Sequence, residues 1–365
     1  MTIINMSRNN GSGKRVSRVT VATSVNSRWK SRDCDFLCDG IDDNVEINNA
    51  IQSLPEDGGE IVILDGTYNI SSSILLNKNN TKISGNGKST KLVRGWNSSS
   101  EEGIINISAV DGGCTIENIY LDGNSDTYDN ANNAGIFTST DNNKISENII
   151  GNSSSAILLS GNKEIVTDNH IFDSDIGINL SGSNSCIVSD NILSNIESKA
   201  ISLSDSLYNN IISNSCNKGN NTESDYTEIQ YSIYLSGSSS NNLITNNMIM
   251  GKDVVDTTGN KTNTVIYNKY DNSSSGEASL SFDDLLCAPG TTVTETESED
   301  GDSGLVTWTT TISQNEIQVA NRVEEEQAET EGKAKWVTTT TMNGNTTVTT
   351  STETDNGWVT NTVDG

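Results

Sequence analysis

A repeat of about 22 residues runs through the middle of the chain and restricts its fold more than any other feature. Each copy places one asparagine at the same point of a short segment in which apolar residues alternate with polar ones. The successive steps are 21, 22, 23, 33 and 21 residues, and the asparagines are Asn148, Asn169, Asn191, Asn214, Asn247 and Asn268. This period indicates a solenoid, because one unit cannot bury its apolar side alone and must stack on its neighbours.

The composition of the units predicts a parallel β-helix. They are rich in Ile, Val, Ser, Asn and Gly with a period of two, whereas leucine-rich repeats of similar length need a dense leucine pattern. A second strand-like segment precedes each asparagine, as in residues 156–160 and 177–181. Stacked coils place equivalent residues about 4.8 Å apart. We therefore expect aliphatic stacks inside and asparagines that hydrogen-bond to one another at a sharp corner.

We predict four segments from the changes in composition along the chain. They are a flexible N-terminal anchor (1–18), a parallel β-helix with an N-terminal cap (19–275), an acidic linker (276–305) and a small antiparallel β domain (306–365). The cap includes a helix that opens at Asp43 with Glu46 as its capping-box partner. Residues 320–335 are interpreted as a charged helix or excursion. The C-terminal domain is either a trimerisation element or a monomeric sandwich.

Charge and hydropathy exclude two classes of function. The 365 residues have a formal net charge of −27, and phosphate backbones are bound by basic surfaces, so nucleic acid is not an expected partner. No run of 18 apolar residues is present, and we expect no membrane span. The first 18 residues lack the apolar core of a secretory signal, so no signal peptide is expected. The acidity favours a halophilic source.

Three segments near the N-terminus together form a recognisable pattern. They are DCDFLCDGIDDNVEINNAI at 33–51, GGEIVILDGTY at 58–68 and ISGNGKSTKL at 83–92. This order resembles the entry of the pectate-lyase-superfamily β-helix, which is found in many viral tailspikes and microbial surface proteins. The likeness covers roughly residues 19–270 and implies a right-handed parallel β-helix. It implies no particular reaction, because lyases, hydrolases and non-catalytic spikes share it.

The reactions best known for this fold lack their residues here. Arginine is absent from residues 95–321, so the repeats carry neither the arginine base of a pectate lyase nor an Arg-x-Lys element. One set of catalytic candidates remains: Glu147, Asp168 and Asp190, each directly before a repeat asparagine, with His170 beside Asp168. Stacked carboxylates suit a retaining or an inverting glycosidase. They equally suit a solvated acidic stripe, or a site for Ca²⁺ or another cation.

Two further groups of residues bear on ligands. Tyr208, Tyr226, Tyr231 and Tyr234 cluster in sequence around an insertion at 217–230, and exposed aromatic rings are a common way to hold sugars. The alternative is that these rings pack under their own loop. The six cysteines show no paired metal spacing, so we predict no zinc site and no cofactor.

These observations favour a homotrimeric spike or fibre at the surface of a virion, outside the cell. We expect it to attach to other virion proteins through its basic N-terminus and to bind a host surface polysaccharide or glycoprotein. One alternative is an enzyme, a polysaccharide lyase or glycoside hydrolase that depolymerises the host envelope polysaccharide through Glu147, Asp168, Asp190 and His170. A second alternative is a non-viral surface adhesin.

Overall fold

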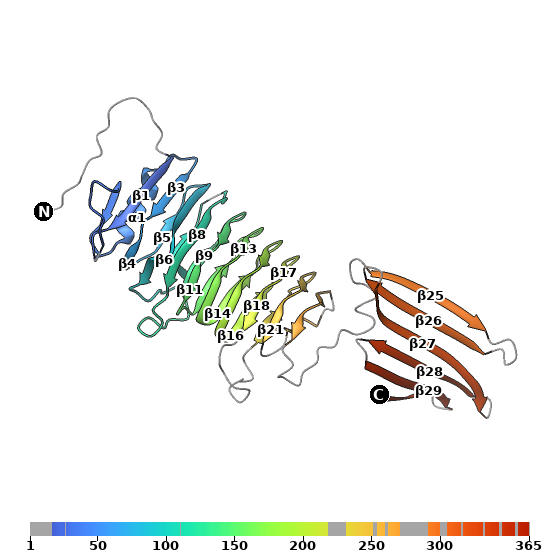
Figure 1. Cartoon of the computed structure of the whole chain (residues 1–365). Coiled ribbons are helices and arrows are strands. Elements are labelled where there is room, and N and C mark those ends of the chain that lie inside the picture. Colours follow the sequence, from blue (N-terminus) through green and yellow to red (C-terminus); the bar gives the residue numbers. More distant parts are fainter. Residues whose placement is uncertain are drawn as a thin grey trace. The chain divides into compact units, whose positions relative to one another are not determined.

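The computed structural model divides the chain into two compact units, residues 1–277 and 278–365, which are described separately (Figure 1). The residues it describes are 17–25, 27–109, 111–217, 231–250, 254–259, 262–270, 291–299, 305–314, 317–330, 333–342, 345–354 and 357–364. Residues 1–16 of the predicted anchor and 218–230 of the predicted insertion lie outside them.

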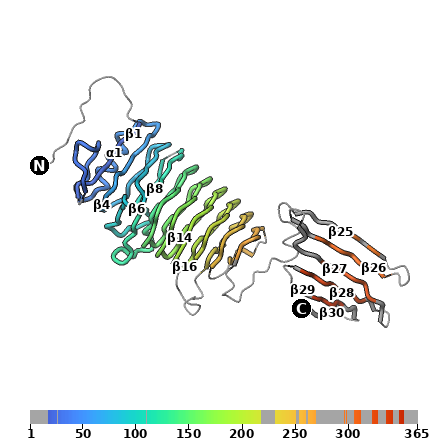
Figure 2. The backbone as a smooth tube through the Cα atoms, in the orientation of Figure 1, coloured from blue at the N-terminus to red at the C-terminus, as the bar shows by residue number. Residues whose placement is uncertain are grey.

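The first unit is a parallel β-helix whose strands stack into three columns (Figure 2). The first strand column holds β1 (Arg18–Thr23), β3 (Gly59–Ile63), the start of β6 (Thr81–Arg94) and of β8 (Thr115–Asp122), β10 (Lys144–Ser146), β13 (Ile165–Thr167), β15 (Ile187–Ser189), β17 (Asn210–Ile212), β20 (Leu243–Thr245) and β23 (Thr264–Ile266). The short strand β2 (Phe36–Cys38) pairs with β1.

The other two columns are completed by strands that bend from one column to the next. The second strand column holds β4 (Gly66–Ile70), the ends of β6 and β8, β11 (Ile149–Gly151), the starts of β14 (His170–Ser181) and β16 (Ile192–Ser204), β18 (Ser215–Asn217), β21 (Met248–Met250) and β24 (Lys269–Tyr270). The third holds β5 (Ile74–Leu76), β7 (Glu102–Ile107), β9 (Asn133–Thr138), β12 (Ser155–Leu159), the ends of β14 and β16, β19 (Tyr231–Ser236) and β22 (Val254–Asp256).

Equivalent inward residues of successive coils form aliphatic stacks, as the repeat predicts. One stack of the third column contains Ile136, Ile157, Ile178, Ile201 and Ile233, all fully buried. Burying a side chain of this size stabilises the folded state by about 1.5–3 kcal/mol relative to leaving it exposed. The core is therefore continuous along the coil axis, and each coil depends on its neighbours.

The six predicted asparagines form a hydrogen-bonded ladder, which confirms the prediction. Each side-chain amide donates to the Oδ1 atom of the asparagine one coil further on, over 3.1, 3.0, 2.9, 3.0 and 2.9 Å. The same Oδ1 atom also accepts from the backbone N–H of the preceding ladder residue, as in Asn169 to Asn191. Asparagine suits this place because it offers an acceptor and two donors in one plane.

A second ladder lies at the turn into the first strand column. Asn209 donates to Asn242, which donates to Asn263. In earlier coils the equivalent positions hold Glu164 and Cys186, each of which precedes the strand that starts in the first column. The asparagine pattern was not recognised in the sequence here because these two residues interrupt it.

The residue before each asparagine of the first ladder adopts the left-handed backbone conformation. Its φ lies between 55° and 60° at Glu147, Asp168, Asp190, Ser213, Asn246 and Tyr267. Asn and Asp tolerate this conformation better than most residues with a side chain. The shape of the corner is therefore one reason for aspartate at positions 168 and 190. It gives no such reason for Glu147.

A helix, α1 (Asn44–Ser53), packs on β1, β2 and β5 at the N-terminal end of the β-helix (Figure 1). Asn44 accepts from the backbone N–H of Ser71, and Asn48 accepts from that of Leu75. The ammonium group of Lys78 donates to the carbonyls of Gln52 and Leu54 at the end of the helix. Cations are favourable there because the helix dipole is negative at its C-terminus.

The predicted capping box is wrong, although the helix begins where expected. Asp43 makes no side-chain cap hydrogen bond. Its carboxylate instead accepts from the backbone N–H groups of Gly40 (2.7 Å) and Asn69 (2.8 Å). Asp43 therefore joins the loop before the helix to strand β4.

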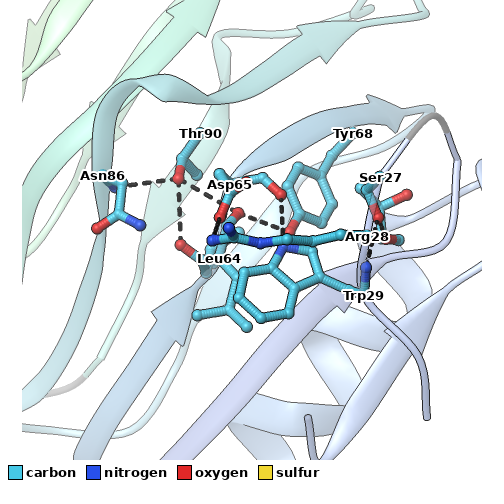
Figure 3. A network of polar contacts seen from close by, with 10 residues as sticks. Ser27, Arg28, Trp29, Leu64, Asp65, Tyr68, Asn86 and Thr90 are labelled. Carbon is cyan, nitrogen blue, oxygen red and sulfur yellow. Dashed lines mark hydrogen bonds and ion pairs between the residues drawn. The ribbon is translucent and has the colours of Figure 1, made fainter. Parts of the chain in front are cut away.

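A polar network ties the loop after β1 to the turn between β3 and β4 (Figure 3). The indole N–H of Trp29 donates to the carbonyl of Asp65 at 3.0 Å, and Arg28 pairs with the Asp65 carboxylate at 3.5 Å. The buried Tyr68 donates its hydroxyl to the carbonyl of Leu64. The segment that resembles the family entry therefore has a structural role.

The second unit contains one antiparallel sheet of six strands in chain order among its described residues. They are β25 (Thr291–Glu299), β26 (Val306–Gln314), β27 (Ile317–Thr330), β28 (Lys333–Met342), β29 (Asn345–Thr354) and β30 (Gly357–Asp364). The small antiparallel β domain is thus confirmed. Two details are wrong: β25 occupies part of the predicted linker, and residues 320–330 and 333–335 are strand. Glutamates alternate with Thr or Ser in β25, whereas β27 contains three consecutive glutamates at 324–326, and in both strands cross-strand pairing outweighs the low strand propensity of glutamate.

Candidate functional site

The structure places the three predicted carboxylates along one corner of the β-helix. Glu147, Asp168 and Asp190 are exposed and follow the ends of β10, β13 and β15. Asp168 accepts a hydrogen bond from the hydroxyl of Thr167 (2.9 Å). A glycosidase acid is normally kept protonated by an apolar pocket. These side chains point to solvent instead, so their surroundings do not distinguish an acid from a base.

His170, the fourth predicted catalytic residue, belongs to an aromatic cluster on the second strand column. We define the aromatic cluster as Tyr120, His170 and Phe172. The ring centroids of His170 and Phe172 are 5.7 Å apart, and those of Tyr120 and Phe172 are 6.3 Å apart. Gly151 lies in the coil between them, and a Cβ atom there would come within 2.6 Å of the Phe172 ring. Glycine therefore gives Phe172 the space to lie over that coil.

Tyr120 and Phe172 were not recognised in the sequence as partners of His170. Register explains their proximity: Tyr120 pairs with Ile149, and Ile149 pairs with His170. Tyr120, Ile149 and His170 therefore project outward in one row along the coil axis, and Phe172 lies in the neighbouring row. His170 is exposed, and the rings of Tyr120 and Phe172 are partly exposed.

An ion pair borders the cluster at its N-terminal side. Lys91 Nζ lies 2.7 Å from Asp122 Oδ2 and 4.8 Å from the centre of the Tyr120 ring. Burial alone favours the neutral form of both groups. It is outweighed for Lys91, whose pKa is raised, by its hydrogen bond to Asp122. It is outweighed for Asp122, whose pKa is lowered, by hydrogen bonds from Lys91, Asn152 and the backbone N–H of Asn124. Both side chains are therefore ionised at neutral pH.

Two lines of left-handed corner residues enclose this face. The first line contains the predicted carboxylates Glu147, Asp168 and Asp190, and the second contains Asn124, Asn152, Asp173 and Asn195. In the second line, Asn195 donates to Asp173 across one coil. A partly apolar floor between rows of oxygen and amide groups can stack against a sugar ring and accept its hydroxyl hydrogen bonds.

Two of the four predicted tyrosines lie together in the described part of the chain. Tyr231 and Tyr234 stack with centroids 4.9 Å apart, and Lys199 lies over the Tyr234 ring at 4.7 Å. Tyr208 stands at a corner between β16 and β17 with 61% of its surface exposed. Tyr226 lies outside the described residues. Two of the four are therefore neighbours, and their role in glycan binding stays a prediction.

One carboxyl group lies in the interior rather than on a face. Glu164 is fully buried in the second ladder, where its Oε1 accepts from Thr138 and Asn143. Its Oε2 has no hydrogen-bond partner. Burial raises the pKa of Glu164 to about 8, although those two hydrogen bonds act in the opposite direction. Because its position is enclosed, Glu164 cannot meet a polymeric substrate.

Three potential metal ligands lie together near the start of α1. Cys38, Asp43 and Glu46 each offer a ligand atom within 4.8 Å of the others. Burial is the main cause that raises the pKa of the Cys38 thiol, which opposes formation of a thiolate ligand. Both Asp43 oxygens already accept backbone hydrogen bonds. This donor set favours a structural polar cluster over a metal site.

Two further cysteines lie in the interior of the repeats. Cys186 and Cys216 are buried and not bonded to another cysteine. Burial raises the pKa of each thiol to about 12. They therefore behave as small hydrophobic residues.

Comparison with family models confirms the fold. Residues 103–270 match the model described as the right handed beta helix region. The chain therefore contains a right-handed parallel β-helix, with the handedness that the sequence resemblance implied. No curated protein sequence matches the chain.

Several solved structures are similar at low identity. ORF18 of Geobacillus virus E2 has 12% identity and a TM-score of 0.49, with 89% of this chain and 74% of that chain covered. The enzymatically active domain of tailspike protein 2 from Bacteriophage CBA120 has 10% identity and a TM-score of 0.49, with 90% and 68% covered. The catalytic domain of a GH87 alpha-1,3-glucanase in complex with nigerose has 18% identity and a TM-score of 0.44. The match covers 62% of this chain but only 43% of the glucanase chain. In the described part of the chain, no helix has the length and apolar character of a membrane span.

Proposed function

We propose that this protein is a spike or fibre of a virion whose β-helix attaches to a glycan on the host cell surface. The observation that carries the proposal is the partly exposed aromatic cluster, which lies between two lines of acidic and amide corner residues. The stacked core holds the backbone of this face in a fixed position. A fixed face loses little conformational entropy when it binds a ligand.

The second unit is proposed to hold three copies of the chain together. Its described residues form a single sheet, whereas domains normally bury a core between two layers. Trp308 stacks on Trp336 with centroids 5.2 Å apart, and Trp308 remains 39% exposed. A second layer from other copies would cover this face. The basic residues before Val19 are proposed to bind other virion proteins, and we propose that the spike lies at the outer surface of the particle.

Binding to an envelope polysaccharide preparation tests the attachment function. The full-length protein is passed over immobilised polysaccharide from the host, and Phe172→Ala is compared with Leu75→Ala, whose side chain is also exposed but lies outside the aromatic face. We expect wild type and Leu75→Ala to bind equally and Phe172→Ala to bind weakly. Equal binding by all three proteins would remove the aromatic cluster from the function. Mass photometry is expected to show a trimer, and a monomer alone would contradict the assembly proposal.

A depolymerase is the second candidate, because the corner carboxylates border His170 on the same side of the β-helix. Either a glycoside hydrolase or a polysaccharide lyase would use Glu147, Asp168, Asp190 and His170. Prolonged incubation with host polysaccharide should then release reducing ends or unsaturated products, and Asp168→Asn should abolish the release. Binding without any release would favour attachment alone.

A further inference from the structure

The outward positions of the second strand column form a long surface with few charges. From Tyr120 onward the outer row continues through Ile149, His170, Ile192, Ser215 and Met248. The row beside it runs through Asp122, Gly151, Phe172, Ser194, Asn217 and Met250. Ile192 is 53% exposed and Met248 is 40% exposed. We call these two rows the floor.

Beside Phe172 and His170 the floor holds no lysine or arginine, and the outer row reaches a lysine only at Lys269, which is exposed and follows Met248 at its far end. Neither residue type occurs in the two rows from Tyr120 to Met250. Lys91, which adjoins the floor, forms an ion pair with Asp122, with 2.7 Å between Lys91 Nζ and Asp122 Oδ2. A carboxylate or sulfate on a sugar stacked against Phe172 and His170 would therefore find no lysine or arginine of the floor beside it to compensate its desolvation.

The edges of the floor are acidic. Glu147, Asp168 and Asp190 are exposed along one edge, and Asp173 is exposed along the other. The whole chain adds a formal net charge of −27, so the wider field has the same sign. An anionic polymer would be repelled, whereas sugar hydroxyl groups can donate hydrogen bonds to the same carboxylates.

We propose that the floor binds an uncharged polysaccharide. Its sugar rings stack on Phe172 and His170, and its hydroxyl groups donate hydrogen bonds to the carboxylates of Asp168, Asp190 and Asp173. This inference rests on the proposed attachment function and specifies its ligand class. It separates the protein from binders of uronic acids, which need cationic side chains on the binding face. The ion pair of Lys91 and Asp122 marks the end of the floor and supports the Tyr120 ring.

Matched pairs of glycans test the ligand class. Oligogalacturonate, alginate oligomers and hyaluronan oligomers are immobilised both in native form and after reduction of their carboxylates to primary alcohols. For every pair that binds, we expect the reduced member to bind at least about tenfold better, and Phe172→Ala to weaken that binding roughly tenfold. Leu75→Ala should leave binding unchanged.

A charge-neutralised variant provides a second readout. Glu147→Gln, Asp168→Asn and Asp190→Asn together remove three negative charges and keep similar shapes. Asn is also well tolerated at a left-handed corner. This variant should bind the acidic members several-fold better than wild type does. Preference of wild type for the acidic members would overturn the inference while leaving attachment intact.

The outcomes also separate the site from the function. If Tyr208→Ala abolishes binding and Phe172→Ala does not, attachment stands but the floor is not its site. If neither the matched pairs nor the host envelope polysaccharide binds, the attachment function itself is contradicted.

Discussion

The β-helix and the C-terminal sheet are both built of β-strands, but they differ in how completely they bury their side chains. In the β-helix, aliphatic stacks such as that of Ile136 to Ile233 are fully buried, and asparagine ladders pair the amides at the corners. In the C-terminal sheet, the side chains whose exposure is described are mostly half-buried, and many of the strand positions are threonine. The β-helix therefore encloses a complete hydrophobic core, whereas the single sheet needs a second layer packed against one of its faces.

The largest effect is expected from breaking the first ladder. Asn191→Ala removes the acceptor for two donors of Asn169 and the donor to Asn214, Val166 and Ser189. Several buried polar groups would lose their partners, and the free energy of unfolding of the β-helix should fall by about 4 kcal/mol. Urea unfolding followed by far-ultraviolet circular dichroism measures it.

The adjacent residue is a matched control for that substitution. Asp190 is exposed and left-handed, and Asp190→Asn keeps a residue type that tolerates this conformation. Its effect on unfolding should stay below about 0.5 kcal/mol. If the control is as destabilising as Asn191→Ala, the ladder does not explain the stability of the corner.

A cavity in an aliphatic stack should be the next largest effect. Ile178→Ala removes three methyl or methylene groups between Ile157 and Ile201 and should cost about 3 kcal/mol. Ile192→Ala, at an exposed position, should cost under about 1 kcal/mol. Comparable losses at both sites would mean that the interior is not tightly packed.

Glu164 gives the stability of the β-helix a dependence on pH. The pKa of about 8 in the folded state lies above the ordinary value of 4.5, so the stabilising contribution of the neutral group is complete below 4.5 and is lost progressively as the pH rises from there to 8. Glu164→Gln supplies a neutral side chain of similar shape. It should match wild type at pH 4 and be more stable by about 2–3 kcal/mol at pH 7. Thermal unfolding at both values measures the difference, and an unchanged difference across pH would contradict a neutral Glu164.

The smallest effect on unfolding is expected in the sheet. Trp308→Ala removes the stacking on Trp336 and should cost the C-terminal unit about 1 kcal/mol, with no change in the unfolding of the β-helix. In mass photometry the trimer of this variant should dissociate at a higher protein concentration than wild type does, because the Trp308 ring is proposed to contact another copy of the chain. An unaltered assembly would place the interface elsewhere.

The fold was predictable from the sequence where the pattern is local and periodic. The asparagine spacing and the alternating Ile and Val residues determine the coil phase, since every coil must bury the same side. The second ladder was not found, because Glu164 and Cys186 replace asparagine in adjacent coils. Strands β25 and β27 were misread because their glutamates resemble a linker or a helix until cross-strand partners are known.

The candidate site was predictable only in part. His170 and the corner carboxylates follow directly from the repeat phase. Tyr120 and Phe172 lie two coils apart, and their contact depends on the register and on Gly151 between them. Aligning the coils by their inward residues would have placed Tyr120, Ile149 and His170 in one row. The identity of the ligand depends on side-chain charges across several coils, which no single motif contains.

A crystal structure of the protein with a neutral oligosaccharide that it binds would test the central claim most directly. We predict a sugar ring stacked on Phe172 or His170 and hydroxyl groups within hydrogen-bond distance of Asp168, Asp190 or Asp173. A sugar held instead beside Tyr208 or on the C-terminal sheet would contradict the account.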